Sequence, residues 1–265
     1  MDSLGDRMKL LEKYEAGRKL LPLLPICIRI DGKNFHSWTK GLARPYDEEL
    51  HEAMVWTTQH LVQETNACIG YTQSDEISLI LYSDNYKKQI LFDGKIQKLT
   101  SVIASMTTAH FNSIKQFFTK LSAKPVALFD TRVWQVPSMT EAANVLVWRE
   151  LDATRNSIES AARSVYSHNE CFKKNGRELQ DMLLKKGINW NDYPDFFKRG
   201  TYIQRYKVTR KFTDKEIEKL PSKHEAWTNP NLTVERSDIR KLALPPITRI
   251  INRESVIFYG RNPIV

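Results

Sequence analysis

Three acidic residues have the types and the context to hold metal ions. Asp31 ends an apolar run over residues 25–31, and Asp75 and Glu76 separate two short β-like runs. Carboxylates brought together repel one another unless a cation neutralises them, and their hard oxygen atoms suit Mg²⁺. Two such ions can activate an attacking hydroxyl group and stabilise a leaving pyrophosphate, which is the chemistry of nucleotidyl transfer. The alternative is structural: Asp31 would cap a loop, and Asp75 and Glu76 would form a solvated turn.

The predicted secondary structure brings these acids together. We expect a strand at 25–31, a helix at 47–66, a hairpin of strands 68–72 and 77–82, a helix at 96–118 and a strand at 127–136. This order is that of a ferredoxin-like antiparallel sheet, the framework of polymerase palm domains. In a right-handed βαβ unit the first two strands are parallel, so the end of the first strand and the hairpin turn share one edge of the sheet. Asp31 is therefore expected beside Asp75 and Glu76.

Further elements are expected on both sides of this unit. We predict helices at 4–20, 176–186 and 189–197, a helical region from Ser138 to about Tyr166, and a strand at 201–212. Ser138 and Glu141 have the spacing of a capping box. The fold class is thus α+β: a palm-like, ferredoxin-like antiparallel sheet packed with helices, plus a C-terminal basic extension. We divide the chain into a palm-like catalytic domain (1–137), elements that complete the catalytic core (138–212) and the extension (213–265).

The composition is that of an ordinary globular protein. Of the 265 residues, 41% are hydrophobic and 27% are charged, which argues against a disordered chain. The longest apolar stretch near the N-terminus is interrupted by Pro22 and Pro25 and is too short to span a bilayer. Cys27, Cys68 and Cys171 lie far apart and form no Cys-x-x-Cys pair, so neither a disulfide framework nor a zinc site is indicated. We expect a cytoplasmic protein with no membrane partner.

The positive charge is concentrated at the C-terminal end. Residues 198–265 contain 15 lysines and arginines against 7 acidic residues, and the whole chain carries a net charge of +9. Such a bias attracts phosphate backbones independently of base sequence, although it also suits a basic surface that binds nothing.

Several motifs together resemble the tRNA-histidine guanylyltransferase family. They are Arg-Ile-Asp-Gly-Lys-Asn-Phe-His at residues 29–36, Arg-Pro at 44–45, Tyr-Thr-Gln-Ser-Asp-Glu-Ile-Ser at 71–78, Phe-Asp-Thr-Arg at 129–132 and Trp-Arg at 148–149. The resemblance covers about residues 4–205. It implies an enzyme that adds nucleotides to tRNA in the 3′-to-5′ direction: the 3′-hydroxyl of a nucleoside triphosphate attacks an activated 5′ end and expels a phosphate-containing leaving group.

The resemblance also implies roles for individual residues. Asp31, Asp75 and Glu76 would be catalytic and, with the Gly32 carbonyl, would hold two Mg²⁺ ions. The nucleotide-binding positions would be Arg29, Lys33, Asn34, Phe35, His36, Arg44, Ser74 and Asn156, with Ser74 and Arg44 on triphosphate oxygens. The implied partners are tRNA and nucleoside triphosphates, with ATP or GTP for activation of the 5′ end, and the implied assembly is a homotetramer.

One departure from the family pattern bears on the substrate. Eukaryotic members carry His-Ile-Asn-Asn shortly after the Trp-Arg pair, whereas this chain has Ala153-Thr-Arg-Asn156, in which only Asn156 matches. The sequence instead resembles the Thg1-like branch, which implies template-dependent repair of 5′-truncated tRNA. The alternatives are addition of a single guanylate to tRNA-histidine, an inactive RNA-binding relative, and a nucleotide cyclase built on the same palm framework.

Basic residues towards the C-terminus are candidates for RNA contact. They are Lys198, Arg199, Lys207, Arg210 and Lys211, which are interleaved with or followed by Tyr202, Tyr206 and Phe212. Aromatic rings can stack on bases while lysine and arginine follow the phosphates. Aromatics that alternate along a strand are, however, more often part of a core, and Lys198-Arg199 also suits an exposed basic turn.

Overall fold

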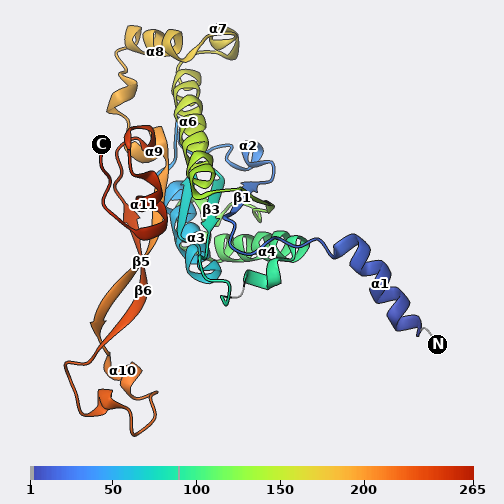
Figure 1. Ribbon diagram of the computed structural model, residues 1–265. Helices are drawn as coiled ribbons and strands as arrows, with labels where there is room; N and C mark the ends of the chain where they lie inside the picture. The colour runs from blue at the N-terminus through green and yellow to red at the C-terminus, as the bar shows by residue number, and fades with distance from the viewer. Residues whose placement is uncertain (1–2, 89) are drawn as a thin grey trace.

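A six-stranded sheet forms the centre of the molecule (Figure 1). The computed structural model describes residues 3–88 and 90–265. The strands are β1 (Ile26–Gly32), β2 (Ile69–Gln73), β3 (Glu76–Leu81), β4 (Phe129–Gln135), β5 (Thr201–Lys211) and β6 (Thr233–Leu242). Their order is β4-β1-β3-β2-β5-β6, and all neighbouring pairs are antiparallel. The first four strands have the ferredoxin-like order predicted from the sequence, so the expected α+β fold is confirmed.

The directions of the strands place the predicted acidic residues at one end of the sheet, which we call the acidic edge. β1 and β2 both run antiparallel to β3, so they are parallel to each other as expected. The C-terminal end of β1 and the turn between β2 and β3 therefore lie at the same end of the sheet. In the β1–β3 register, Asp31 is directly opposite Glu76.

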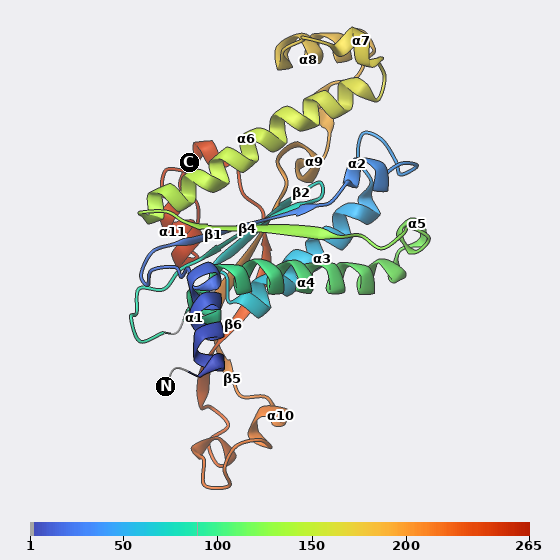
Figure 2. The same ribbon diagram turned by 90° about the vertical axis from the view of Figure 1, so that its right-hand side faces the viewer.

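Helices cover both faces of the sheet. The helices of the described residues are α1 (Leu4–Ala16), α2 (Phe35–Trp38), α3 (Glu48–Thr65), α4 (Ile96–Ile114), α5 (Thr119–Ser122), α6 (Met139–Arg163), α7 (His168–Cys171), α8 (Gly176–Lys185), α9 (Asp195–Arg199), α10 (Asp214–Ile217) and α11 (Arg253–Tyr259), of which α1 and α10 project away from the sheet (Figure 1). Figure 2 shows α3 and α4 on one face and α6 on the other. Ile28 and Ile30 of β1 pack with the α3 and α4 layer, whereas Cys27 packs with the α6 and α11 layer. The core therefore has two layers, separated by the sheet.

The helices that flank the acidic edge begin at polar caps. The Asp47 carboxylate accepts the Leu50 N–H at 3.2 Å and starts α3. Ser138 starts α6 by accepting the Glu141 N–H at 3.2 Å. The predicted capping box is only half formed, because the Glu141 carboxylate accepts from Asn144 at 3.0 Å instead of returning to Ser138.

Some predicted boundaries were wrong. The helix expected at 4–20 ends at Ala16, before Gly17, and the one expected at 96–118 ends at Ile114, where a tighter 3₁₀ turn follows. The helix expected at 189–197 is a 3₁₀ turn followed by α9. Pro194 separates them, because the residue before a proline is held in an extended conformation.

The C-terminal residues contribute to the sheet and to the core. β6 pairs with β5 along its whole length, and Val256 and Ile257 of α11 are buried beside α6. The far end of the β5–β6 hairpin, with α10, projects from the body (Figure 1). The division of the chain at residues 137 and 212 stays a prediction. In the part of the chain that the structure describes, no helix has both the length and the apolar character needed to cross a membrane.

Candidate active site

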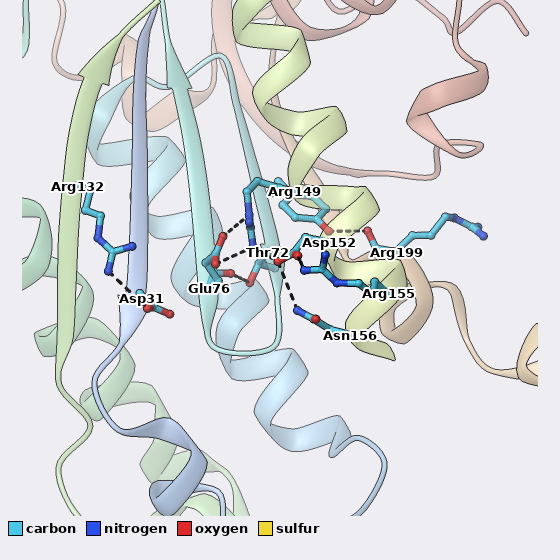
Figure 3. Close-up of polar contacts among 10 residues, drawn as sticks. Asp31, Thr72, Glu76, Arg132, Arg149, Asp152, Arg155, Asn156 and Arg199 are labelled. Carbon is cyan, nitrogen blue, oxygen red and sulfur yellow. Dashed lines mark hydrogen bonds and ion pairs between the residues drawn. The ribbon is translucent and has the colours of Figure 1, made fainter. Parts of the chain in front are cut away.

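Acidic side chains form a row across three strands at the edge of the sheet. Asp31 on β1 is directly opposite Glu76 on β3 and Asp130 on β4. Directly opposed residues of antiparallel strands share a face, with Cβ atoms about 4.5–5.5 Å apart, and like charges in these positions destabilise the sheet. Arg132 partly offsets this repulsion, since its Nη2 lies 4.0 Å from Asp31 and 3.7 Å from Asp130 (Figure 3).

Arg149 of α6 holds the Glu76 carboxylate. Its Nη2 donates to Glu76 Oε2 at 2.9 Å and to Asp152 Oδ2 at 3.0 Å. Asp152 also accepts from Arg155 and, at 3.4 Å, from Asn156, so four residues of α6 form one network beside the sheet (Figure 3). The Arg149 side chain is 7% exposed, and the Glu76 side chain is 19% exposed. Glu76 is therefore fixed by an ion pair between the sheet and α6.

Asp75 occupies the turn between β2 and β3. Ser74, before it, has a left-handed backbone with φ of 55°, and Ser74 Oγ donates to Asp75 Oδ1 at 3.0 Å. Burial, together with the nearby charge of Asp31, raises the pKa of the Asp75 carboxyl to about 6, although hydrogen bonds from its own backbone and from Ser74 oppose the rise. The ionised form of Asp75 is thus disfavoured, and a cation beside Asp31 and Asp75 would relieve that cost.

The residues present fit a magnesium site that is completed by substrate. Among the described residues, no cluster of three or more histidine, cysteine, aspartate or glutamate side chains has the arrangement of a metal site. Mg²⁺ commonly takes only one or two carboxylates and completes its shell with water and substrate phosphates. Asp31 and Asp75 match that donor set. Gly32, the other predicted donor, has only its backbone carbonyl to offer, and a larger residue would not fit there because a Cβ would lie 2.2 Å from the Phe35 ring.

A cavity of about 500 Å³ opens beside these acids, which is within the usual size range of small-ligand sites. We call it the acidic cavity. Among its lining residues are the predicted Asp31, Phe35, His36, Arg44, Ser74, Asp75, Glu76 and Asn156. Eight residues predicted from the sequence therefore line one cavity, and their roles in it stay a prediction.

An aromatic wall closes one side of the acidic cavity. The rings of His51 and Phe196 are stacked with centroids 4.0 Å apart, and Tyr46 packs edge-on against Phe196 at 5.2 Å. Burial lowers the pKa of His51 to about 4, so its ring is uncharged at neutral pH. The cavity thus has an acidic end and an aromatic end. A nucleotide would fit this arrangement, because metal-bound phosphates suit the acidic end and a base suits the aromatic end.

Three predicted nucleotide-binding residues do not line the cavity. The Arg29 guanidinium lies over the Trp148 ring, 5.4 Å from its centroid. Lys33 donates its backbone N–H to the Leu128 carbonyl at 2.8 Å, and Asn34 precedes α2 in a left-handed conformation. Phe35 reaches the cavity but is only 3% exposed, because its ring stacks on Trp38 in the core.

The predicted RNA-binding residues fall into two groups. Lys198 and Arg199 end α9, and both pair with Asp195, at 3.3 Å and 2.7 Å. Lys207, Arg210 and Lys211 lie further along β5, towards the projecting end of the hairpin. Acidic partners already engage two of these, since Lys207 pairs with Glu235 at 2.8 Å and Arg210 with Glu216 at 2.7 Å.

Sequence reasoning missed two parts of the site. Arg149 belongs to the Trp-Arg motif, but nothing in its spacing showed that it would reach Glu76. The aromatic wall gave no sequence signal, because His51 and Phe196 come from distant helices. Phe196 was visible only as part of a predicted helix.

The chain is similar to known proteins in both sequence and fold. Residues 6–137 match the family described as tRNAHis guanylyltransferase. The structure of a bacterial tRNA(His) guanylyltransferase (Thg1)-like protein in complex with ATP is 42% identical, with a TM-score of 0.72, over 77% of this chain and 87% of that chain. A second such structure, in complex with GTP, is 34% identical, with a TM-score of 0.71, over 94% of this chain and 95% of that chain. The tRNA(His) guanylyltransferase of Saccharomyces cerevisiae is 28% identical over 213 residues, which are 74% of this chain and 88% of the yeast protein. The chain belongs to the tRNAHis guanylyltransferase family and is therefore a nucleotidyltransferase.

Proposed function

We propose that this protein is a template-dependent 3′-to-5′ nucleotidyltransferase that repairs the 5′ ends of truncated tRNAs. The observation that carries the proposal is that Asp31 and Glu76 lie opposite each other on neighbouring strands and both line the acidic cavity, with Asp75 in the adjoining turn. The bacterial relatives whose structures contain ATP or GTP support a nucleotide as the ligand of this cavity.

In the proposed reaction, the 3′-hydroxyl oxygen of the incoming nucleotide forms a bond with the 5′-terminal phosphorus of the tRNA. The bond between that phosphorus and its leaving group breaks. The leaving group is pyrophosphate from a triphosphorylated 5′ end, or a nucleoside monophosphate from an end activated with ATP or GTP. Two Mg²⁺ ions, when bound, would neutralise phosphate charge and favour deprotonation of the attacking hydroxyl.

The protein's own residues would bind and orient the reactants. Asp31 and Asp75, with the Gly32 carbonyl, would hold the metal ions, while Arg149 keeps Glu76 in place beside them. Arg44 and Ser74 are in the cavity wall and would bind triphosphate oxygens. The stacked rings of His51 and Phe196 would contact the base.

The composition of α6 supports templated addition over dedicated guanylate addition. Where eukaryotic family members carry His-Ile-Asn-Asn, this chain places Arg155 and Asn156, and both side chains bind Asp152. These residues therefore strengthen the network around Arg149. They do not recreate the polar set of the guanylate-adding enzymes.

A direct assay tests the proposal. Purified protein with Mg²⁺ and each nucleoside triphosphate should extend a tRNA that lacks its first 5′ nucleotide, adding the nucleotide complementary to the opposing strand. Changing the opposing base should change the nucleotide that is added. Addition of guanylate alone, and only to tRNA-histidine, would instead establish the single-guanylate alternative. Binding of tRNA without any addition of nucleotide would indicate the inactive relative.

The homotetramer implied by the family resemblance is a separate proposal, and light scattering of the purified protein tests it.

A further inference from the structure

A second and larger cavity lies at the opposite end of the sheet. It encloses about 1360 Å³, against about 500 Å³ for the acidic cavity. Its lining includes Ile26 and Leu81, whereas Asp31 and Glu76 line the acidic cavity at the other ends of the same two strands. At a rise of about 3.3 Å per residue, Ile26 and Asp31 are roughly 17 Å apart. We call this second cavity the basic groove.

The charge of the basic groove is one-sided. Its wall contains seven lysines and arginines, among them Lys95, Lys98, Arg205, Arg240, Arg261 and Lys207, the last of which is paired with Glu235 outside the groove. Asp93 is the one acidic residue among the described residues that line the groove, and it already forms an ion pair with Lys19. These cations come from four separate parts of the fold, so the charge is a product of tertiary structure.

Neighbouring side chains hold two arginines in place in the wall of the groove. Arg240 donates through Nη2 to Gln204 at 2.9 Å, and its guanidinium lies over the Tyr206 ring, 4.8 Å from the centroid. Arg205 donates through Nη1 to Asn66. Within the described residues, the buried Nε atoms of Arg205 and Arg240 have no hydrogen-bond acceptor. Guanidinium groups held in place in a positively charged groove favour an anionic ligand.

Aromatic rings alternate with these cations. Tyr259 is 57% exposed at the groove, and Lys98 lies over the Phe92 ring, 5.3 Å from its centroid. Tyr82 and Phe258 pack edge-on at 5.3 Å. Proteins that bind single-stranded or looped nucleic acids use this combination: lysine and arginine contact the phosphates, and unstacked bases stack on the aromatic rings.

We propose that the basic groove binds RNA, namely a part of the tRNA away from the 5′ end that reacts in the acidic cavity. This inference rests on the proposed tRNA substrate. The volume of the groove is above the range of small-ligand sites, which favours a polymer. The groove supplies affinity for the body of the tRNA, and the acidic cavity supplies chemistry.

Charge reversal of exposed groove residues tests the inference. Lys98→Glu combined with Arg261→Glu changes two exposed side chains of the groove and leaves the acidic cavity intact. The control is Arg177→Glu combined with Lys185→Glu, the same change of charge at exposed positions of α8 that line neither cavity. Both proteins should keep the parent's thermal unfolding midpoint. If the reversed pair does not fold, Lys95→Gln combined with Lys98→Gln takes its place.

Binding is measured directly, with a labelled, 5′-truncated tRNA transcript and with a hairpin that carries only its acceptor stem. We expect the groove variant to bind the tRNA about tenfold more weakly, with the slope of log K against log salt reduced by about 2. The groove variant should bind the acceptor-stem hairpin as tightly as the parent does. The control variant should bind both RNAs with the affinity of the parent. Parental affinity of the groove variant for the tRNA would overturn the inference, as would binding of phosphatidylserine vesicles in place of RNA. Binding is measured without turnover, so the two proposals can fail separately. If the protein binds tRNA through the groove but adds no nucleotide, only the proposed function is contradicted.

Discussion

Arg149 Nη2 donates to Glu76 Oε2 at 2.9 Å, which links the middle of α6 to the first residue of β3. This contact joins residues far apart in the chain and fixes one acid of the row opposite Asp31. Burial raises the pKa of Glu76, while the charges of Arg149 and Arg29 lower it. The acidic edge is therefore held by guanidinium groups before any substrate binds.

Replacement of Arg149 tests this support. Arg149→Met should lower the free energy of unfolding by about 3 kcal/mol, because it leaves the largely buried Glu76 without its cation and leaves Asp152 with only the exposed Arg155. Nucleotide addition should fall by at least about tenfold, because a misplaced carboxylate disturbs the geometry of the site. Urea denaturation and single-turnover addition measure the two effects. Arg155→Ala is the control: that side chain is 67% exposed, so its loss should cost at most about 1 kcal/mol.

Asp75 is predicted to be indispensable for turnover. Asp75→Asn removes a charge expected to bind Mg²⁺ and should reduce the rate of addition on the order of 1000-fold, the equivalent of about 4 kcal/mol. Its tRNA affinity should be unchanged. Asp130→Asn is the matched control, since Asp130 lies beside Asp31 in the neighbouring acidic row but does not line the acidic cavity. Equal rates for the Asp75 variant and the parent across a Mg²⁺ titration would refute the metal assignment.

Arg44 is predicted to bind the triphosphate. It is exposed in the wall of the acidic cavity, so Arg44→Ala should leave the fold intact and remove a charge-assisted contact with phosphate oxygens. The KM for the nucleoside triphosphate should rise about tenfold, with a smaller change in kcat. Lys40→Ala, an exposed cation nearby in the chain that does not line the cavity, should have no such effect. A fall in kcat at constant KM would assign Arg44 to the chemical step instead.

The sequence predicted the parts of the fold that depend on local pattern and order. The strand and helix sequence of residues 25–136 determined the sheet order, and with it the meeting of Asp31 and Glu76. The family resemblance inferred from the motifs is also confirmed. β6 was not foreseen, because its alternation of exposed and half-buried residues gives no strong apolar pattern, and its pairing with β5 supplies the order. The burial of Phe35 and the reach of Arg149 depend on how α2 and α6 pack, which short-range spacing does not encode.

Glu150, beside Arg149 on α6, gives a prediction on stability and pH. Its side chain is buried, and it accepts from the Tyr202 hydroxyl and from the Ile247 N–H, both at 2.8 Å. Burial raises the pKa of Glu150 above its ordinary value, although both hydrogen bonds oppose the rise. The folded protein therefore binds this proton more tightly than the unfolded chain does. Protonation of Glu150 therefore stabilises the folded protein. This contribution is present in full below the pKa of Glu150 in the unfolded chain, about 4.3, and it is lost as the pH rises through its higher pKa in the folded protein.

Glu150→Gln removes that titration and can keep both hydrogen bonds, because its amide oxygen accepts from Ile247 and its NH₂ can donate to the Tyr202 oxygen. We expect the variant to exceed the parent in free energy of unfolding by about 1 kcal/mol at pH 8, with the difference vanishing near pH 4. Glu150→Ala is the control: it leaves two buried donors without acceptors and should be less stable than the parent at both pH values. Urea denaturation from pH 4 to pH 8 measures all three proteins. A glutamine variant less stable than the parent at pH 8 would mean that the ionised carboxylate stabilises the fold, because its hydrogen bonds outweigh the cost of burying its charge.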